Sequence, residues 1–151
     1  MPTRTFEDFD VGDSYELGSR TVTKREIVSF AEQYDPQPFH VDEAAAAESH
    51  FGGLVASGWH TAAIMTELCV RNLFDEVAAA GGLGVDELRW PAPVRPGDTL
   101  SGVVEVVDTR PSSSRADRGY VGFEMRLEND RDETVLTMVN RQIILREAGQ
   151  S

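Results

Sequence analysis

Hydrophobic and polar positions alternate along the C-terminal half of the chain, as they do in half-buried β-strands. The clearest stretch is 120–128, followed by a turn and a further stretch at 134–145. The expected buried face of 120–128 carries Val121, Phe123, Met125 and Leu127. A valine-rich strand at 99–108 precedes a polar turn at 111–118, and an earlier strand around 85–94 is interrupted by two prolines. The pattern predicts a four-stranded antiparallel meander.

Helical spacing replaces this alternation in the N-terminal half. Thr23 and Glu26 have the spacing of a capping box, and apolar positions then recur at helical intervals as far as Tyr34. These positions are Ile27, Phe30, Ala31 and Tyr34. A proline two residues further on ends the helix. Asp42 is suited to cap a second short helix over residues 43–48.

A longer helix is expected over residues 58–77, with Ser57 at its N-cap. Its charged positions, all on one stripe, are Glu67, Arg71 and Asp75. Apolar side chains cover most of the remaining surface, so this helix needs cover on most sides, and a short strand at 14–19 completes a sheet that supplies it. The pattern predicts the α+β class: one domain over residues 1–151, with an antiparallel sheet of about five strands wrapped around a long central helix. The hot-dog fold is the best-known arrangement of this kind.

Composition and charge argue against several kinds of partner. The 151 residues carry a formal charge of -12 without a cluster of lysine and arginine, so nucleic acid is not an expected partner. No apolar run approaches the roughly 18 residues that cross a bilayer, and the first residues do not resemble a secretory signal, so none is expected. A cytoplasmic protein with no membrane span is therefore expected. Lys24 is the only lysine, which fits either adaptation to concentrated salt or a GC-rich genome.

Cysteine and histidine give no pattern of metal ligands. Cys69 stands alone in an apolar stretch, which is typical of core packing. His50 and His60 do not have the helical spacing of a ligand pair, either with each other or with His40. A metal site is not expected.

Asp35 and His40 are the first candidates for chemistry. Asp35 follows the predicted first helix, where the negative end of the helix dipole disfavours a carboxylate. His40 comes five residues later, and Pro36 and Pro38 stiffen the link between the two. A carboxylate and an imidazole held together are suited to general acid and base catalysis. The alternative is that Asp35 bonds nearby backbone amides and His40 is a satisfied core histidine.

Gly58 is the third candidate, because the segment 51–59 brings it to the start of the long helix. Unsatisfied N–H groups at that end attract an anion or a developing oxyanion, and a missing side chain lets a carbonyl oxygen approach closely. Ser57 caps the same helix end. The alternative is an ordinary tight turn before a capped helix.

The order of these residues resembles a known family. Asp35 and His40, with Ser57 and Gly58 some twenty residues later, resemble the hydratase motif of MaoC-like dehydratases and (R)-specific enoyl-CoA hydratases. Residues 89–100, Arg-Trp-Pro-Ala-Pro-Val-Arg-Pro-Gly-Asp-Thr-Leu, resemble the strand and Gly-Asp turn of the same family. Together these signals extend over most of the chain in the family's order.

The resemblance implies an enoyl-CoA hydratase or 3-hydroxyacyl-CoA dehydratase with a hot-dog fold. A water activated by Asp35 and His40 would add to a trans-2-enoyl-CoA and give a (3R)-3-hydroxyacyl-CoA. Gly58, beside Ser57, would bind the thioester oxygen. No cofactor is implied beyond the CoA of the substrate, and the expected assembly is a homodimer formed through edge strands. Gln37 stands where many members carry asparagine, which leaves the acyl-chain preference open. Two alternatives remain: a hot-dog acyl-CoA thioesterase, and a non-catalytic acyl-CoA-binding subunit, against which the intact catalytic pair counts.

Overall fold

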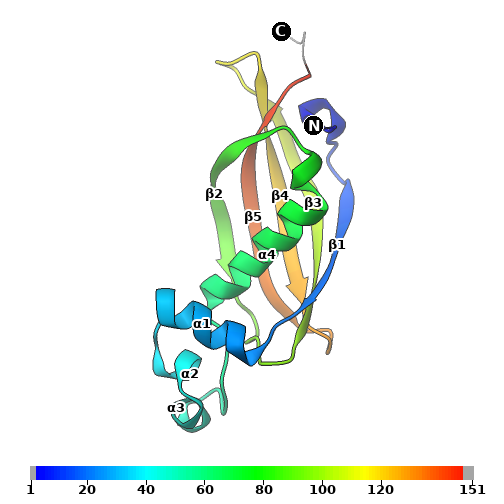
Figure 1. The fold of residues 1–151 in the computed structure, drawn as a ribbon. Coiled ribbons are helices and arrows are strands. Elements are labelled where there is room, and N and C mark those ends of the chain that lie inside the picture. The colour runs from blue at the N-terminus through cyan, green and yellow to red at the C-terminus, as the bar shows by residue number, and fades with distance from the viewer. Residues whose placement is uncertain (1–2, 148–151) are drawn as a thin grey trace.

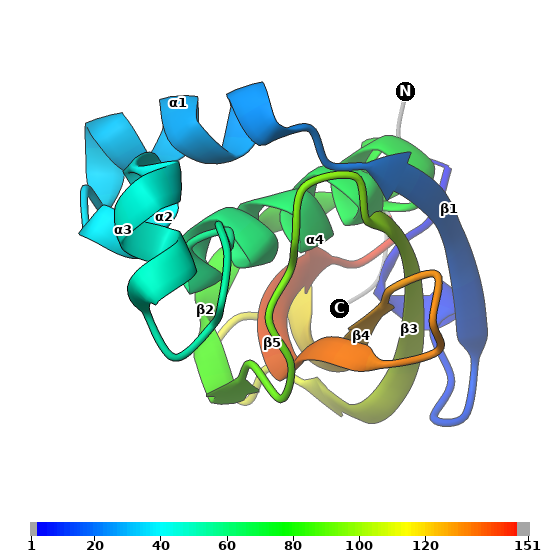
Figure 2. The ribbon, with the colours of Figure 1, turned by 90° about the horizontal axis from the view of Figure 1, so that it is seen from below.

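Five antiparallel strands form one curved sheet around a long helix (Figures 1 and 2) in the computed structural model, which describes residues 3–147. The strands lie in the order β1-β3-β4-β5-β2 across the sheet. Their bounds are β1 Ser14–Thr21, β2 Ala79–Arg89, β3 Thr99–Pro111, β4 Arg118–Glu128 and β5 Thr134–Leu145. Helix α4, Gly58–Asn72, lies against the concave face of the sheet. The predicted α+β class and hot-dog arrangement are confirmed.

The core lies between α4 and the inner face of the sheet. In β4 the alternating side chains Val121, Phe123, Met125 and Leu127 are all buried, as the sequence pattern predicts. The register between β3 and β4 continues this buried layer across the sheet, because Val104 and Val106 of β3 lie opposite Met125 and Phe123. The helix supplies the facing apolar side chains, which are Ile64, Met65 and Leu68. Burial of this layer from water is the main force that holds the helix in the curve of the sheet.

Three short helices gather beyond the N-terminal end of α4 (Figure 1): α1 Lys24–Tyr34, α2 Pro38–Val41 and α3 Glu43–Glu48. The predicted caps are present, since Thr23 accepts a hydrogen bond from the Glu26 N–H and Asp42 accepts one from the Ala44 N–H. Helix α2 was not predicted. It is a single turn of four residues, Pro38–Val41, which is too short to show a helical repeat of apolar positions in the sequence.

The long helix ends earlier than the predicted Val77. It stops at Asn72, and a 3-10 turn over Phe74–Glu76 follows. The Asn72 side chain donates hydrogen bonds to the carbonyls of Leu68 and Leu17, and Leu73 turns into the core. Tertiary packing and a side chain that bonds the backbone therefore end the helix before its periodic pattern ends.

The predicted strand at 85–94 is displaced toward the N-terminus in the structure. Strand β2 begins at Ala79 and ends at Arg89, because the prolines after Trp90 lack the N–H groups that a ladder needs. Its first half contains glycines at positive φ, Gly81 and Gly84, and its register with β5 shifts several times. A glycine-rich strand with irregular pairing shows no alternation of apolar and polar residues in the sequence. The predicted position of this strand was therefore wrong.

Large apolar side chains remain exposed on both α4 and β2. They are Trp59 and Val70 of α4, and Leu83 and Val85 of β2. We call these four residues the open apolar face. The cover expected on most sides of α4 therefore leaves Trp59 and Val70 open in a single chain. No helix within residues 3–147 is long and apolar enough to cross a membrane.

Candidate functional site

Asp35 and His40 meet at the junction of α1 and α2. Asp35 is the C-cap of α1, where its backbone N–H donates to Ala31, and His40 lies in the single turn of α2. The Oδ2 atom of Asp35 is 3.4 Å from Nε2 of His40. The two side chains are only 18% and 7% exposed. The proline-stiffened link thus holds a carboxylate and an imidazole face to face.

The His40 ring is oriented by the backbone of the segment before α4. Its Nδ1 lies 2.7 Å from the carbonyl oxygen of Val55. A carbonyl oxygen can only accept, so Nδ1 carries the hydrogen and Nε2 of the neutral ring has a lone pair. That lone pair is on the side of Asp35. His40 is therefore a satisfied buried histidine at one nitrogen and an available base at the other.

Asp35 is held by two side-chain donors. Nε2 of Gln37 donates to Oδ1, and Oγ of Ser57 donates to Oδ2, each at 2.7 Å. Burial by itself raises the pKa of Asp35, but the hydrogen bonds from Gln37 and Ser57, together with the positive charge that His40 carries when its ring is protonated, outweigh it and lower the pKa. The carboxylate is therefore ionised at neutral pH. The donors to Asp35 are side chains, in contrast to the alternative of nearby backbone amides.

Ser57 and Gly58 lie at the N-terminal end of α4, beside the pair. Ser57 is fully buried, and its Oγ accepts from the Trp59 N–H while it donates to Asp35. It is thus both the helix cap and a partner of the carboxylate. The N–H of Gly58 meets no acceptor within the described part of the chain. A donor at the positive end of a helix remains available to a ligand.

One cavity of about 430 Å³ brings these groups together. Asp35, Gln37, His40 and Gly58 line it, whereas Ser57 lies behind Asp35. The remaining wall is largely apolar and comes from Phe39, Phe51, Val55, Ala56, Trp59, Thr61 and residues 90–94. A mostly apolar cavity with a few convergent polar groups is the usual form of a small-molecule site.

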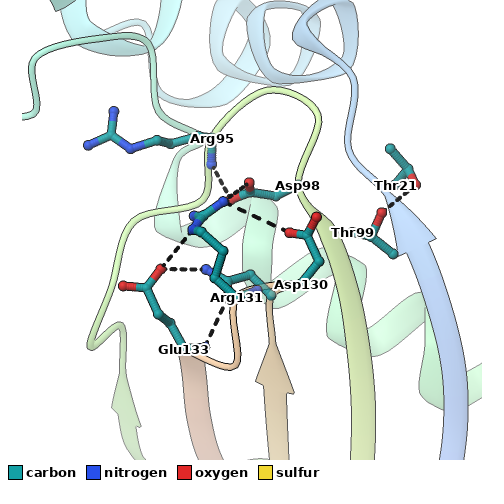
Figure 3. Close-up of polar contacts among 8 residues, drawn as sticks. Thr21, Arg95, Asp98, Thr99, Asp130, Arg131 and Glu133 are labelled. Atoms are coloured by element: carbon teal, nitrogen blue, oxygen red, sulfur yellow. Dashed lines mark hydrogen bonds and ion pairs between the residues drawn. The ribbon is translucent and has the colours of Figure 1, made fainter.

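A polar cluster at one end of the sheet fixes part of this wall (Figure 3). The buried carboxylate of Asp98 accepts from the Arg95 N–H at 2.9 Å and from the Arg131 guanidinium at 3.0 Å. Arg131 comes from the turn between β4 and β5, where it also pairs with Glu133. The Arg95 side chain donates to the Phe51 carbonyl at 2.7 Å. The Gly-Asp turn therefore connects the far turn of the sheet to the loop that lines the cavity.

Sequence reasoning missed three contributors to the site. Gln37 was noted only for replacing asparagine, Val55 acts through its carbonyl, and Trp90 belonged to a predicted strand. The position of Gln37, two residues after Asp35, was a usable signal. A backbone carbonyl and an aromatic residue beside prolines carry no comparable signal.

The other histidines and the cysteine lie outside this cavity lining. His50 packs against Phe51, and the buried His60 stacks on Phe30 with ring centroids 4.7 Å apart. Burial lowers the pKa of His60, and its Nδ1 has no hydrogen-bond partner in the described region. Cys69 is in the core, where burial raises its pKa to about 12 and keeps the thiol protonated. Within residues 3–147, no group of three or more potential ligands could hold a metal ion.

Comparison with known proteins gives a consistent family. The sequence matches the MaoC like domain over residues 8–122. A 3-hydroxybutyryl-CoA dehydratase of Methylorubrum extorquens is 33% identical over 113 residues, which are 74% of this chain and 69% of that protein. The crystal structure of a MaoC-like dehydratase from Rhodospirillum rubrum is 42% identical, with a TM-score of 0.88 over 95% of this chain and 97% of that one. An (R)-hydratase from Pseudomonas aeruginosa, at 24% identity and a TM-score of 0.75 over 95% of this chain and 86% of that one, is similar in fold.

Proposed function

The chain belongs to the MaoC-like family, and on that premise we propose that it is an enoyl-CoA hydratase. In the proposed reaction, water adds to the C2–C3 double bond of a trans-2-enoyl-CoA and gives a (3R)-3-hydroxyacyl-CoA. The reverse reaction is the dehydration of the same product. One observation carries the proposal: an ionised Asp35 and the free lone pair of His40 face each other 3.4 Å apart in the wall of an acyl-sized cavity.

The pair is arranged to bind one water molecule. Two acceptors at 3.4 Å do not bond each other, but a water at normal distance from both can donate one hydrogen to each. The water oxygen then bonds to C3 while His40 Nε2 takes its proton. The electron pair of the double bond moves toward the thioester carbonyl and returns to form a C2–H bond with a proton delivered by the pair. The hydrogen and the hydroxyl thus both come from water, and Asp35 and His40 end as they began.

Gly58 supplies the electrophilic part of the proposed site. Negative charge develops on the thioester oxygen as C3 is attacked, and the N–H of Gly58 is free to donate to it. One such donor is worth about 3 to 4 kcal/mol in the transition state. Ser57 acts behind this contact by fixing Asp35 and the helix end. The reaction so described needs no cofactor beyond the CoA of the substrate.

A double assay on crotonyl-CoA tests the proposal. Hydration removes the conjugated double bond, so the ultraviolet absorbance of the enoyl thioester falls while no free thiol appears. Thiol release with the double bond intact would instead identify an acyl-CoA thioesterase. Binding of crotonyl-CoA without either change would identify a non-catalytic binding subunit. Either of these outcomes contradicts the proposed reaction.

We further propose that a second copy of the chain covers the open apolar face. Strand β2 is an edge strand of the sheet (Figure 1) and is exposed almost throughout, and Trp59 and Val70 of α4 are exposed as well. A twofold axis would pair two such edges and bury exposed apolar side chains of both copies. Light scattering after gel filtration should give a dimer, and Leu83→Asp should give monomers. Val11→Asp, which places the same charge at an exposed valine outside this face, should leave the dimer intact; a monomeric parent protein would contradict the proposal.

A further inference from the structure

The indole of Trp90 lies directly on Gly58. A Cβ atom added at Gly58 would stand 2.5, 2.7 and 2.8 Å from three atoms of the Trp90 ring, closer than real side chains approach. The same indole meets the ring of Trp59 edge to face, with centroids 5.3 Å apart. The absence of a side chain at Gly58 is therefore needed for the position of Trp90, irrespective of any ligand.

The backbone on both sides of Trp90 is restrained. On one side it continues from Arg89, the last residue of β2. On the other side, Pro91 and Pro93 limit the backbone torsions as far as Val94, whose carbonyl accepts from the Ala56 N–H at 2.9 Å. A bulky side chain on a restrained segment acts as a fixed wall, although Trp90 as a whole residue is 41% exposed.

This wall stands next to the position of the reacting group. If the thioester oxygen binds the N–H of Gly58, as the proposed function requires, the carbonyl carbon and the groups attached to it lie close to the indole. The cavity of about 430 Å³ is at the small end of the range for ligand sites, and it must also hold the end of the pantetheine arm. We infer that Trp90 limits the length of the acyl group and that the site is built for short-chain enoyl thioesters. The inference rests on the proposed function.

Chain-length profiles of variants test this role. We would measure kcat/KM for enoyl-CoA substrates of about four, eight and twelve carbons, because a missing or added methylene changes discrimination by roughly tenfold or more. The parent protein should prefer the shortest substrate. Trp90→Ala should raise the ratio of long-chain to short-chain kcat/KM by at least about tenfold, and Trp90→Phe should raise it less. Tyr120→Ala, which truncates an aromatic side chain on β4 outside the cavity lining, should leave the ratio unchanged.

The contact with Gly58 gives a second, independent readout. Gly58→Ala should lower the melting temperature of the parent protein, because the new methyl group displaces the indole, and should lower it little in a Trp90→Ala background. Equal losses in both backgrounds would show that the indole is not what excludes a side chain at Gly58.

The outcomes distinguish a failure of the role of Trp90 from a failure of the proposed function. If the parent protein hydrates crotonyl-CoA but Trp90→Ala and Trp90→Phe keep its chain-length profile, the role of Trp90 is refuted and the proposed function stands. If the parent protein prefers the longest substrate, the role of Trp90 is likewise refuted and the proposed function stands. If the parent hydrates no enoyl-CoA of any length, the proposed function fails, and the inference fails with it.

Discussion

Replacing Ser57 by alanine separates its two roles. The hydroxyl caps α4 by accepting from the Trp59 N–H at 3.2 Å, and it donates to Asp35 at 2.7 Å. Loss of an N-cap costs about 1 kcal/mol, and loss of a hydrogen bond to a charged group costs about 1.5 to 3 kcal/mol. Asp35 keeps its bond from Gln37 and some contact with solvent, so the combined destabilisation should be about 2 to 3 kcal/mol.

Thr23→Ala is the matched control, because it removes the N-cap of α1 without touching the site. For a chain of this length each kcal/mol lowers the melting temperature by about 2 to 4 °C. Thr23→Ala should therefore lower the melting temperature by about 2 to 4 °C, and Ser57→Ala should lower it by roughly 4 to 12 °C. The excess loss in Ser57→Ala over the control measures the hydrogen bond to the Asp35 carboxylate.

The pH profile of hydration gives the readout that a cap alone cannot change. The Ser57 hydrogen bond lowers the pKa of Asp35, so its removal raises that pKa. The acidic limb of kcat/KM should then move to higher pH in Ser57→Ala, with kcat at neutral pH down about tenfold. If the acidic limb and kcat stay unchanged and the loss in melting temperature equals that of Thr23→Ala, Ser57 is a cap only.

Three further predictions concern stability and the cavity wall. Because the formal charge is -12 with Lys24 as the only lysine, the melting temperature should rise between low and molar KCl, and an unchanged value would remove the argument for adaptation to salt. Burial lowers the pKa of His60, so the folded protein binds a proton at this residue less readily than the unfolded chain does. The free energy of unfolding should therefore fall as the pH decreases below about 6.5, the ordinary pKa of histidine. The His60→Phe variant should show a smaller fall over the same pH range. Arg131→Met leaves the buried carboxylate of Asp98 without its ion pair, so the melting temperature should fall by several degrees. The same variant should raise KM by a larger factor than it lowers kcat. An equal change in both constants would argue against a link to the cavity wall.

Periodic patterns predicted those parts of the fold in which local and tertiary forces agree. The alternation in β4 and the caps of α1 and α3 are of this kind, since each depends on residues close together in the chain. The end of α4 and the position of β2 depend on partners far away: Asn72 bonds to Leu17, and β2 follows the path of β5. Such partners leave no local pattern.

The candidate site divides in the same way. Asp35 and His40 were identified because the stiff link between them is short, and Ser57 and Gly58 because a capped helix begins there. The hydrogen bond from Ser57 to Asp35 spans 22 residues of sequence, and the contact of Trp90 with Gly58 joins the segment after β2 to α4. Gln37 was within reach of local reasoning, because its side chain bonds a residue only two positions away.

The rate of crotonyl-CoA hydration by Asp35→Asn and His40→Ala tests the central claim most directly. Each variant should remain folded and lose at least about a hundredfold in kcat, because each removes one of the two groups that bind the water in the proposed reaction. The double variant should lose little more than the slower single variant, since the pair acts on a single water molecule. Turnover close to that of the parent protein in either single variant would contradict the account.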